Sequence, residues 1–472
     1  MTPHTALLQP ATGKTAAAVS LALITAILTG CAAPRTPAPD STLTVPTAWA
    51  ARTAGEPVAA AWWRGFGDEV LDGLVSTALQ NNSNLRAARS RVQEYRARAA
   101  VVDAGSVPSL DMSAGPTRAR ARNGSGVLAQ STTYQLGVQA SYEVDLWGRL
   151  DRLTDSALAS VQAQRAARDA AELSIAAMVA AGYFNLRGLD AQLALARETV
   201  TSRKESLSRA QRLFDAGYSS RLDWAQAESE YQFAAAAVPP LERSVSQQEN
   251  ALSILMGRNP GPVERGRAIA DIVAPAIAAG LPSELLRRRP DIAQAELQLV
   301  SLNYNLQASR DQLLPSLRLS AGASIQGLTL HQLVDGPTTI WSIGASVLEP
   351  LLQRARLQAG VDMAAAQRDQ ALLSYEDVVR HAFAEVEDAL KAIASISSQQ
   401  QALSRRSQAA AQALRIAQSR YRNGYASYLE ELDAQRTSYA AQQGLLQSNT
   451  AQLTASVDLY RALGGGWNTA AE

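Results

Sequence analysis

The sequence predicts a mainly α-helical chain that carries a small membrane-type β part, built as one unit repeated in tandem. Three observations predict this fold class: two very long stretches without proline, four segments in which apolar and polar residues alternate, and short motifs that recur at an offset of 207 residues. Proline disrupts helix interiors, so its absence permits long helices. Alternation with period two is typical of a strand whose two faces meet different surroundings.

The composition argues against several classes of protein. The 472 residues include 44 Lys and Arg against 43 Asp and Glu, a net charge of +1, whereas nucleic-acid-binding proteins usually have a clear basic excess. One cysteine excludes disulfides within the chain, and three histidines are too few for most histidine-based metal sites. No acid–base pair or nucleophile arrangement stands out. We therefore expect no enzyme, no metal site and no cofactor.

The N-terminus is expected to be a lipoprotein signal peptide over residues 1–30. An apolar run from Ala16 to Leu28 is shorter than the about 20 residues that a transmembrane helix needs. The run ends in the sequence LTGC, which resembles the lipobox of bacterial lipoproteins. That resemblance implies lipidation of Cys31, palmitate included, and an outer-membrane address; an ordinary signal peptide with a chance cysteine is the alternative. Residues 31–66, rich in proline at first, are expected to form a lipidated tether.

The body is expected to contain two structural repeats, residues 67–257 and 282–464, joined by an equatorial segment, 258–281, and followed by a tail, 465–472. Each repeat contains a helical segment, two alternating segments, a long helix and a further helix. Among the motifs that recur at the common offset are Pro108-Ser109-Leu110 with Pro315-Ser316-Leu317, Gly217-Tyr218 with Gly424-Tyr425, and Gly257 with Gly464.

The alternating segments are expected to be β-strands. Their lengths suit membrane strands, which need about 9–11 residues. A soluble, half-buried sheet alternates in the same way, so alternation does not by itself prove a membrane location. The expected strands are about 108–122 and 132–145 in the first repeat and about 315–328 and 338–348 in the second.

The first expected strand ends in a basic cluster formed by Arg118, Arg120 and Arg122. These arginines have the same parity as the apolar Leu110. Either a bulge near Gly115 flips the register, or the arginines rise above the hydrocarbon. They would then lie at the outer mouth of a channel or against lipid phosphates; a solvated loop base is the third interpretation.

The long proline-free stretches are expected to be helices from Gly148 to about Phe214 and from Leu351 to Arg422. At ~1.5 Å rise per residue each would span about 100 Å. The shorter helical segments, about 69–105 and 220–256, would match one long helix when placed end to end. This length relation predicts a helical tube.

Four membrane strands in one chain cannot close into a barrel, and open sheet edges are not tolerated in lipid. Two chains would give eight strands, a barrel filled by its own side chains, whereas three would give twelve strands and a lumen. If the strands enter a membrane, we therefore expect a homotrimer with a 12-stranded barrel.

Several sequences resemble the outer-membrane factor family, and specifically its lipoprotein (NodT-like) branch. They are LPSELLRRRPDI at 281–292, SYEVDLWGR at 141–149, RYRNGYASYL at 420–429 and LDAQR at 432–436. The resemblance runs from about residue 55 to Trp467. Family members are trimeric 12-stranded barrels continued by a long periplasmic α-helical barrel. They are the exit ducts of tripartite pumps and are not enzymes.

This resemblance implies a passive duct in the outer membrane of a Gram-negative bacterium, exporting small molecules such as drugs. The implied partners are a periplasmic adaptor (membrane fusion) protein and an inner-membrane pump of the resistance-nodulation-division type, with no nucleic acid. A conduit for type I protein secretion and a non-conducting periplasmic scaffold are the alternatives.

The resemblance also implies a periplasmic gate formed by Leu429, Asp433 and Arg436. Leu429 and Asp433 are four residues apart and share a helix face, so a trimer would present an apolar ring and a carboxylate ring. Carboxylates brought together need a partner, and Arg436 can supply it. The faces of Glu430 and Glu431 stay open. A solvated helix end with an ordinary ion pair is the alternative.

Overall fold

The structure is a computed structural model that describes residues 42–50, 55, 58–122 and 124–467. The expected signal peptide, Cys31, much of the expected tether and the last five residues of the tail lie outside the described residues. The described chain divides into two compact units. The strand unit comprises Tyr95–Val161 and Leu297–Leu373, and the helical unit comprises Thr42–Glu94, Gln162–Glu296 and the residues from Ser374 onward.

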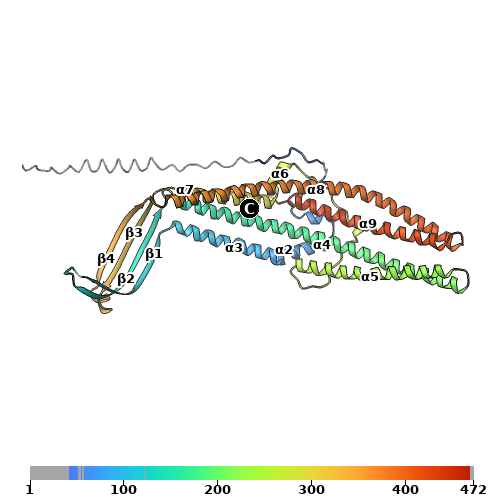
Figure 1. Cartoon of the computed structure of the whole chain (residues 1–472), viewed down its shortest axis with the longest axis horizontal. Helices are drawn as coiled ribbons and strands as arrows, with labels where there is room; N and C mark the ends of the chain where they lie inside the picture. Colours follow the sequence, from blue (N-terminus) through green and yellow to red (C-terminus); the bar gives the residue numbers. More distant parts are fainter. Residues whose placement is uncertain (1–41, 51–54, 56–57, 123, 468–472) are drawn as a thin grey trace, which may run out of the picture. The chain divides into compact units, whose positions relative to one another are not determined.

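The predicted helix-strand-strand-helix-helix unit occurs twice (Figure 1). The final helices of the two copies begin and end at positions that differ by the offset of the sequence motifs. The elements are η1 (Trp62–Phe66), α2 (Glu69–Asn81), α3 (Ser83–Asp103), η2 (Ala104–Ser106), β1 (Ser109–Arg122), β2 (Leu128–Val144), α4 (Arg149–Asp215), α5 (Arg221–Leu255), η3 (Ile269–Asp271), α6 (Pro282–Arg288), α7 (Pro290–Asp311), β3 (Ser316–Gly327), η4 (His331–Leu333), β4 (Thr338–Leu348), α8 (Arg354–Arg422) and α9 (Tyr428–Ala462).

The four strands form one antiparallel sheet in the order β1-β2-β3-β4. β2 begins at Leu128, four residues before the expected start, because its pairing with β1 continues to the hairpin turn. Directly paired residues share a face, so the register assigns every strand residue to one of two faces. The apolar face includes Leu110, Met112, Leu136, Val138, Leu319, Ala321, Trp341 and Ile343, and the polar face includes Asp111, Ser113, Gln135, Gln139, Arg318, Ser320, Ser342 and Ser346.

The bulge near Gly115, one of the two alternatives for β1, is wrong. The pairing of β1 with β2 keeps a single register from Ser109 to Arg122. A bulge would place two residues of one strand opposite one residue of the other, and no such step occurs between these two strands. The parity of β1 is therefore preserved along its whole length.

Glycine and serine residues set the turns that join the long helices to the final helices. Gly217 and Gly424 both have φ of 75°, a left-handed conformation that favours glycine. Tyr218 N donates to Leu213 O at 2.8 Å and closes the turn after α4. Ser220 and Ser427 cap the helices that follow. We call these two turns, with the adjoining helix ends, the tip of the helical unit.

The core of the helical unit is built around aromatic side chains. Trp62 stacks on Tyr460 with ring centroids 4.9 Å apart, and Phe66 contacts Phe184. Trp62 and Phe66 belong to η1, within the range expected to be a tether. These residues pack into the core because a buried aromatic ring removes a large apolar area from water.

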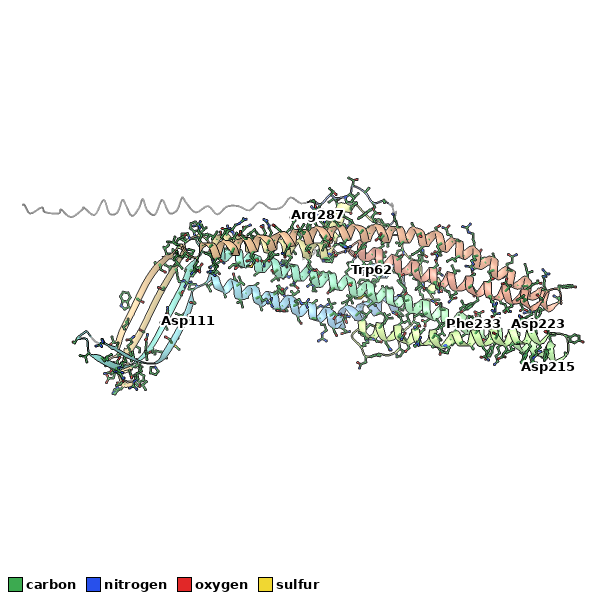
Figure 2. All side chains as sticks on the ribbon, in the orientation of Figure 1. Trp62, Asp111, Asp215, Asp223, Phe233 and Arg287 are labelled. Carbon is green, nitrogen blue, oxygen red and sulfur yellow. The ribbon has the colours of Figure 1, made fainter. Side chains whose placement is uncertain are left out.

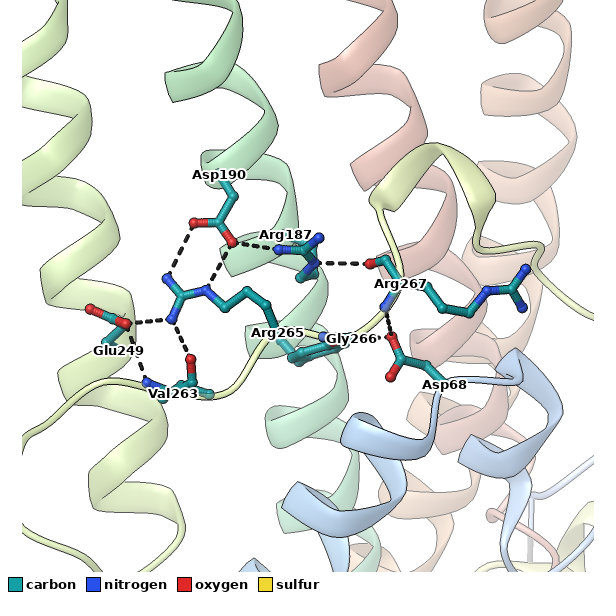
Figure 3. A network of polar contacts seen from close by, with 9 residues as sticks. Asp68, Arg187, Asp190, Glu249, Val263, Arg265, Gly266 and Arg267 are labelled. Atoms are coloured by element: carbon teal, nitrogen blue, oxygen red, sulfur yellow. Dashed lines mark hydrogen bonds and ion pairs between the residues drawn. The ribbon is translucent and has the colours of Figure 1, made fainter. Parts of the chain in front are cut away.

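The segment between the repeats is bound to α4 and α5 by ionic contacts (Figure 3). Arg265 Nε donates to Asp190 Oδ2 at 3.0 Å, and Arg265 Nη1 donates to Glu249. Arg187 also donates to Asp190, at 2.8 Å. These contacts hold the segment against two helices of the first repeat.

Asp68 organises a second set of contacts in the same network. It caps α2 by accepting from Val70 N at 3.0 Å, and it accepts from the Tyr183 hydroxyl at 2.8 Å. Gly266 N donates to the same hydroxyl oxygen at 3.0 Å, and Arg267 N donates to Asp68 at 3.1 Å. Burial is the main reason that the Tyr183 pKa is raised above its usual range.

Candidate functional site

The three predicted gate residues lie on one exposed surface of α9 at the tip. Leu429, Asp433 and Arg436 are four and three residues apart, which places them on neighbouring turns of one helix face. All three are exposed, and Leu429 retains 59% of its accessible surface. We call these residues the gate face. Within the described chain, Leu429 and Asp433 thus remain open to solvent.

The adjoining face of α9 packs on α4 and α5. Tyr428 and Leu432 are buried with Ala210 of α4 and Ala227 of α5. Burial raises the pKa of Tyr428 to about 12. This small cluster sets the rotation of α9 about its axis, and that rotation leaves Leu429 and Asp433 exposed.

The buried face also settles the positions of the two neighbouring acids. Glu431 is 2% exposed and accepts a hydrogen bond from Gln435 Nε2 at 2.9 Å. Its burial raises the pKa of this carboxyl. Glu430 is exposed on the other side, 4.0 Å from Arg420. Consecutive helix residues point about 100° apart, which explains the different surroundings.

Arg436 makes its hydrogen bonds with Glu230 of α5. Arg436 Nε donates to Glu230 Oε1 at 3.0 Å, and Nη2 contacts the same oxygen. Asp433, the partner expected from the sequence, acts on Arg436 only as a nearby charge. The hydrogen bond with Glu230 is the main reason that the Arg436 pKa is raised. Arg436 thus links the gate face to the preceding repeat.

Glu230 lies between two guanidinium groups. Its second oxygen, Oε2, is 3.8 Å from Nη2 of Arg203 in α4, and both side chains are less than 10% exposed. Burial lowers the pKa of Arg203, because a low-dielectric environment disfavours the charged form. Arg203, Glu230, Arg436 and Tyr439 line a pocket of about 400 Å³, together with Phe233. Phe233 itself is largely exposed, and it is labelled in Figure 2.

Arg203 and Glu230 were missed by the sequence analysis, although the sequence contains a signal for each. Arg203 lies midway between Ala196 and Ala210, with seven-residue spacing on a buried helix face. Glu230 lies in the same way among the buried alanines on one face of α5. Charged residues on such stripes are seldom buried without a partner. A lone charge within an alanine stripe therefore indicates a specific contact.

The basic cluster at the end of β1 lies on the apolar face of the sheet. Arg118, Arg120 and Arg122 are paired with Thr132, Gln130 and Leu128. Arg118 donates to Gln130 Oε1 at 3.2 Å, and Arg122 donates to the Gly126 carbonyl at 2.6 Å. Both partners are uncharged.

In the described ranges, no helix combines the length and the hydrophobicity that are needed to cross a membrane.

The chain matches the protein family described as "Outer membrane efflux protein" over residues 74–258 and again over 281–465. Among similar proteins is the pyoverdine export outer membrane protein OpmQ of Pseudomonas putida KT2440. It is 34% identical over 455 residues, which are 93% of this chain and 95% of that protein. The solvent efflux pump outer membrane protein SrpC of Pseudomonas putida is 35% identical over 407 residues, 85% of this chain and 87% of that protein.

Solved structures of outer-membrane channels have the same fold. The channel OprN superposes with a TM-score of 0.85 at 28% identity, covering 93% of this chain and 99% of that chain. The open state of the Neisseria gonorrhoeae MtrE channel gives a TM-score of 0.82 at 31% identity, covering 92% and 98%. The predicted fold class is confirmed by these likenesses. The named relatives give no support to a secretion conduit or a scaffold.

Proposed function

We propose that this chain, which belongs to the outer membrane efflux protein family, works as a homotrimeric duct that is gated at its tip. The chain is an outer-membrane protein, and its function is that of an exit duct in an efflux pump. The proposal adds the oligomeric state, the gate, the lipid anchor and the partners. The observation that carries the gate is the exposed gate face on a helix whose other face is fully packed.

The open sheet supports the trimer. β1 and β4 each have one edge that no strand of the described residues pairs. Unpaired backbone groups are costly in lipid, so each edge needs a strand from another copy. Three copies give twelve strands, enough for a lumen. The apolar face would then meet lipid, and the polar face would line the channel.

The gate face supports a constriction at the tip. In a trimer, three copies of Leu429 and Asp433 facing a common axis would place an apolar ring beside a ring of carboxylates. An apolar ring excludes water from the constriction. Carboxylates that are brought together repel anions and one another. Arg436 would hold each α9 against α5 through Glu230. Movement of α9 away from the axis would therefore require the Arg436–Glu230 contact to change.

A periplasmic adaptor and an inner-membrane pump of the resistance-nodulation-division type are the proposed partners. A passive duct has no energy source of its own, so transport must be driven by a partner in the inner membrane. Relatives named for export of pyoverdine and solvents support small molecules as the cargo class. Lipidation of Cys31 would anchor each copy to the outer membrane.

Single-channel conductance in planar bilayers tests the gate. The variant carries Leu429→Ser with Asp433→Ser, and the matched control carries Leu222→Ser with Gln226→Ser at the equivalent positions of α5. We expect low conductance for the wild type and the control, and a large rise for the variant. Equal conductance of all three from verified trimers would overturn the gate but keep the duct. Absence of conductance in every sample would overturn the duct itself.

A further inference from the structure

The basic cluster, Arg118, Arg120 and Arg122, follows directly on the apolar rows of β1. On this face, β1 presents Leu110, Met112 and Ala114 in succession, then a proline, and then the three arginines. β2 presents apolar or aromatic residues opposite the first four rows, ending with Tyr134. The change from apolar to basic therefore occurs on one continuous surface.

The height of the apolar face matches a hydrocarbon layer. On β2 this face runs from Val144, paired with Leu317, to Tyr134, paired with Gly327. The ten steps between these residues, at ~3.4 Å each, measure about 34 Å along the strand. With a tilt of about 40°, this becomes a band of about 26 Å, close to the about 25 Å of membrane barrels. Tyr134 lies at its upper edge, where aromatic residues concentrate.

The arginines lie in the next three rows above this band. Arg118 is paired with Thr132, two residues beyond Tyr134 on β2. Successive rows on one face are about 7 Å apart along the strand, or about 5 Å in height at the same tilt. Arg118, Arg120 and Arg122 are thus about 5, 10 and 15 Å above the band at their backbone. Arg118 lies within the layer of lipid headgroups, which is about 5–8 Å thick on each side of the hydrocarbon. The long side chains of the other two can extend back toward this layer, as arginines near a membrane surface do.

The charge of the cluster is uncompensated within the described chain. No acidic side chain in the described residues forms an ion pair with these three arginines, and the partners of Arg118 and Arg122 are neutral. A guanidinium group binds a phosphate with two parallel hydrogen bonds, which an ammonium group cannot match. Three guanidinium groups on alternate residues of one strand suit a surface that carries several phosphates.

The opposite face argues against a role in lining the channel. Residues of the other parity at the same height are Thr117, Ala119 and Ala121, which are small and uncharged. The unbroken register keeps these residues, and not the arginines, on the polar face. Arginines that control ion selection at the mouth would be expected at these three positions.

We infer that Arg118, Arg120 and Arg122 bind phosphate groups of lipids in the outer leaflet of the outer membrane, on the lipid side of the barrel. The inference rests on the proposed function, because that proposal turns the apolar face toward lipid. Each trimer would carry three such sites, one on each β1–β2 hairpin. Their binding would fix the depth of the barrel in the membrane.

The test compares full-length trimers in phosphatidylcholine nanodiscs with and without lipid A. Choline balances the phosphate charge of the first lipid, whereas the sugar of lipid A carries two phosphates with no such cation. The variant is R118Q/R120Q/R122Q, and the control is R405Q/R406Q/R415Q, which removes three exposed arginines of α8. We expect lipid A to raise the Tm of the wild type and the control. The lipid A concentration that gives half of the Tm rise should be at least tenfold higher for the variant, because three charge-assisted contacts are lost.

Two further arms identify the source of the phosphate. Dephosphorylated lipid A should not raise the Tm of the wild type, and inorganic phosphate at the same phosphate concentration should have no effect. Equal binding of lipid A to variant and control would overturn the inference. A changed ion selectivity with unchanged lipid A binding would overturn it too and place the arginines at the mouth. Loss of conductance in all trimers would contradict the proposed duct. Lipid A binding is measured independently of conductance, so failure of the duct and failure of this inference are distinguishable.

Discussion

Replacing Arg436 by methionine should open the duct by releasing α9 from α5. Methionine has a similar length and a high helix propensity but no charge and no hydrogen-bond donor. The change removes the hydrogen bond from Arg436 Nε to Glu230 Oε1, which is 3.0 Å long, and the second contact from Nη2. Among the described residues, Arg203 at 3.8 Å then remains as the ion-pair partner of Glu230.

The expected cost follows from the unequal burial of the two side chains. Glu230 is 9% exposed, whereas Arg436 is 59% exposed. Removing one partner of a fully buried pair costs about 3–5 kcal/mol, and an exposed pair is worth about 0–1 kcal/mol. In this pair only Glu230 is buried, and Arg203 remains 3.8 Å away. The loss of Arg436 should therefore cost about 1–2 kcal/mol, between these two limits. Each protomer would then shift the closed-to-open ratio by roughly 5- to 30-fold.

Single-channel recording of open probability measures this shift. Arg197→Met is the control, because Arg197 of α4 forms a 2.7 Å ion pair with Glu242 of α5, the helix that also carries Glu230, and both side chains are largely exposed. The control should leave the open probability unchanged. In a double variant with Glu230→Gln, the two effects should not add, because both substitutions break the same contact.

An unchanged open probability of Arg436→Met, in trimers that unfold at the wild-type temperature, would refute this reasoning. Equal opening by Arg197→Met would also refute it, because the effect would then follow from the loss of any ion pair made by α5 and not from the release of α9. Additive effects of Arg436→Met and Glu230→Gln would show that the two side chains act independently.

Two other predictions concern stability. Gly266→Ala should destabilise the helical unit by about 2–3 kcal/mol in chemical unfolding, because its Cβ would overlap the carboxylate of Asp68; Gly73→Ala, with open space around it, should not destabilise it. Glu431→Gln should flatten the pH dependence of the Tm. Since burial raises the folded-state pKa of Glu431 above 4.5, its contribution is complete below about pH 4.5 and is lost as the pH rises through the folded pKa. The Tm of the variant minus the Tm of the wild type should therefore be larger at pH 7 than at pH 4.5. An equal Tm difference at both pH values would contradict the assignment.

The sequence was informative wherever the signal was local or periodic. Helix ends at Gly217 and Gly424 depend on a few adjacent residues, and a glycine with positive φ is a local requirement. The strand faces follow from alternation within single segments. Even the missed Arg203 and Glu230 could have been noticed as isolated charges on alanine stripes, although their partners could not have been named.

The sequence by itself therefore determined the lengths of the long helices, the tandem repeat, the alternating strands and the i, i+4 spacing of Leu429 and Asp433. Only the tertiary structure decided that Arg436 binds Glu230, a residue 206 positions away. It also decided the face of the arginine cluster, because a one-residue slip in register would reverse every side chain of β1. The physical reason is the same in both cases. A contact between distant segments depends on how whole helices and strands pack and pair, and no local pattern records that choice.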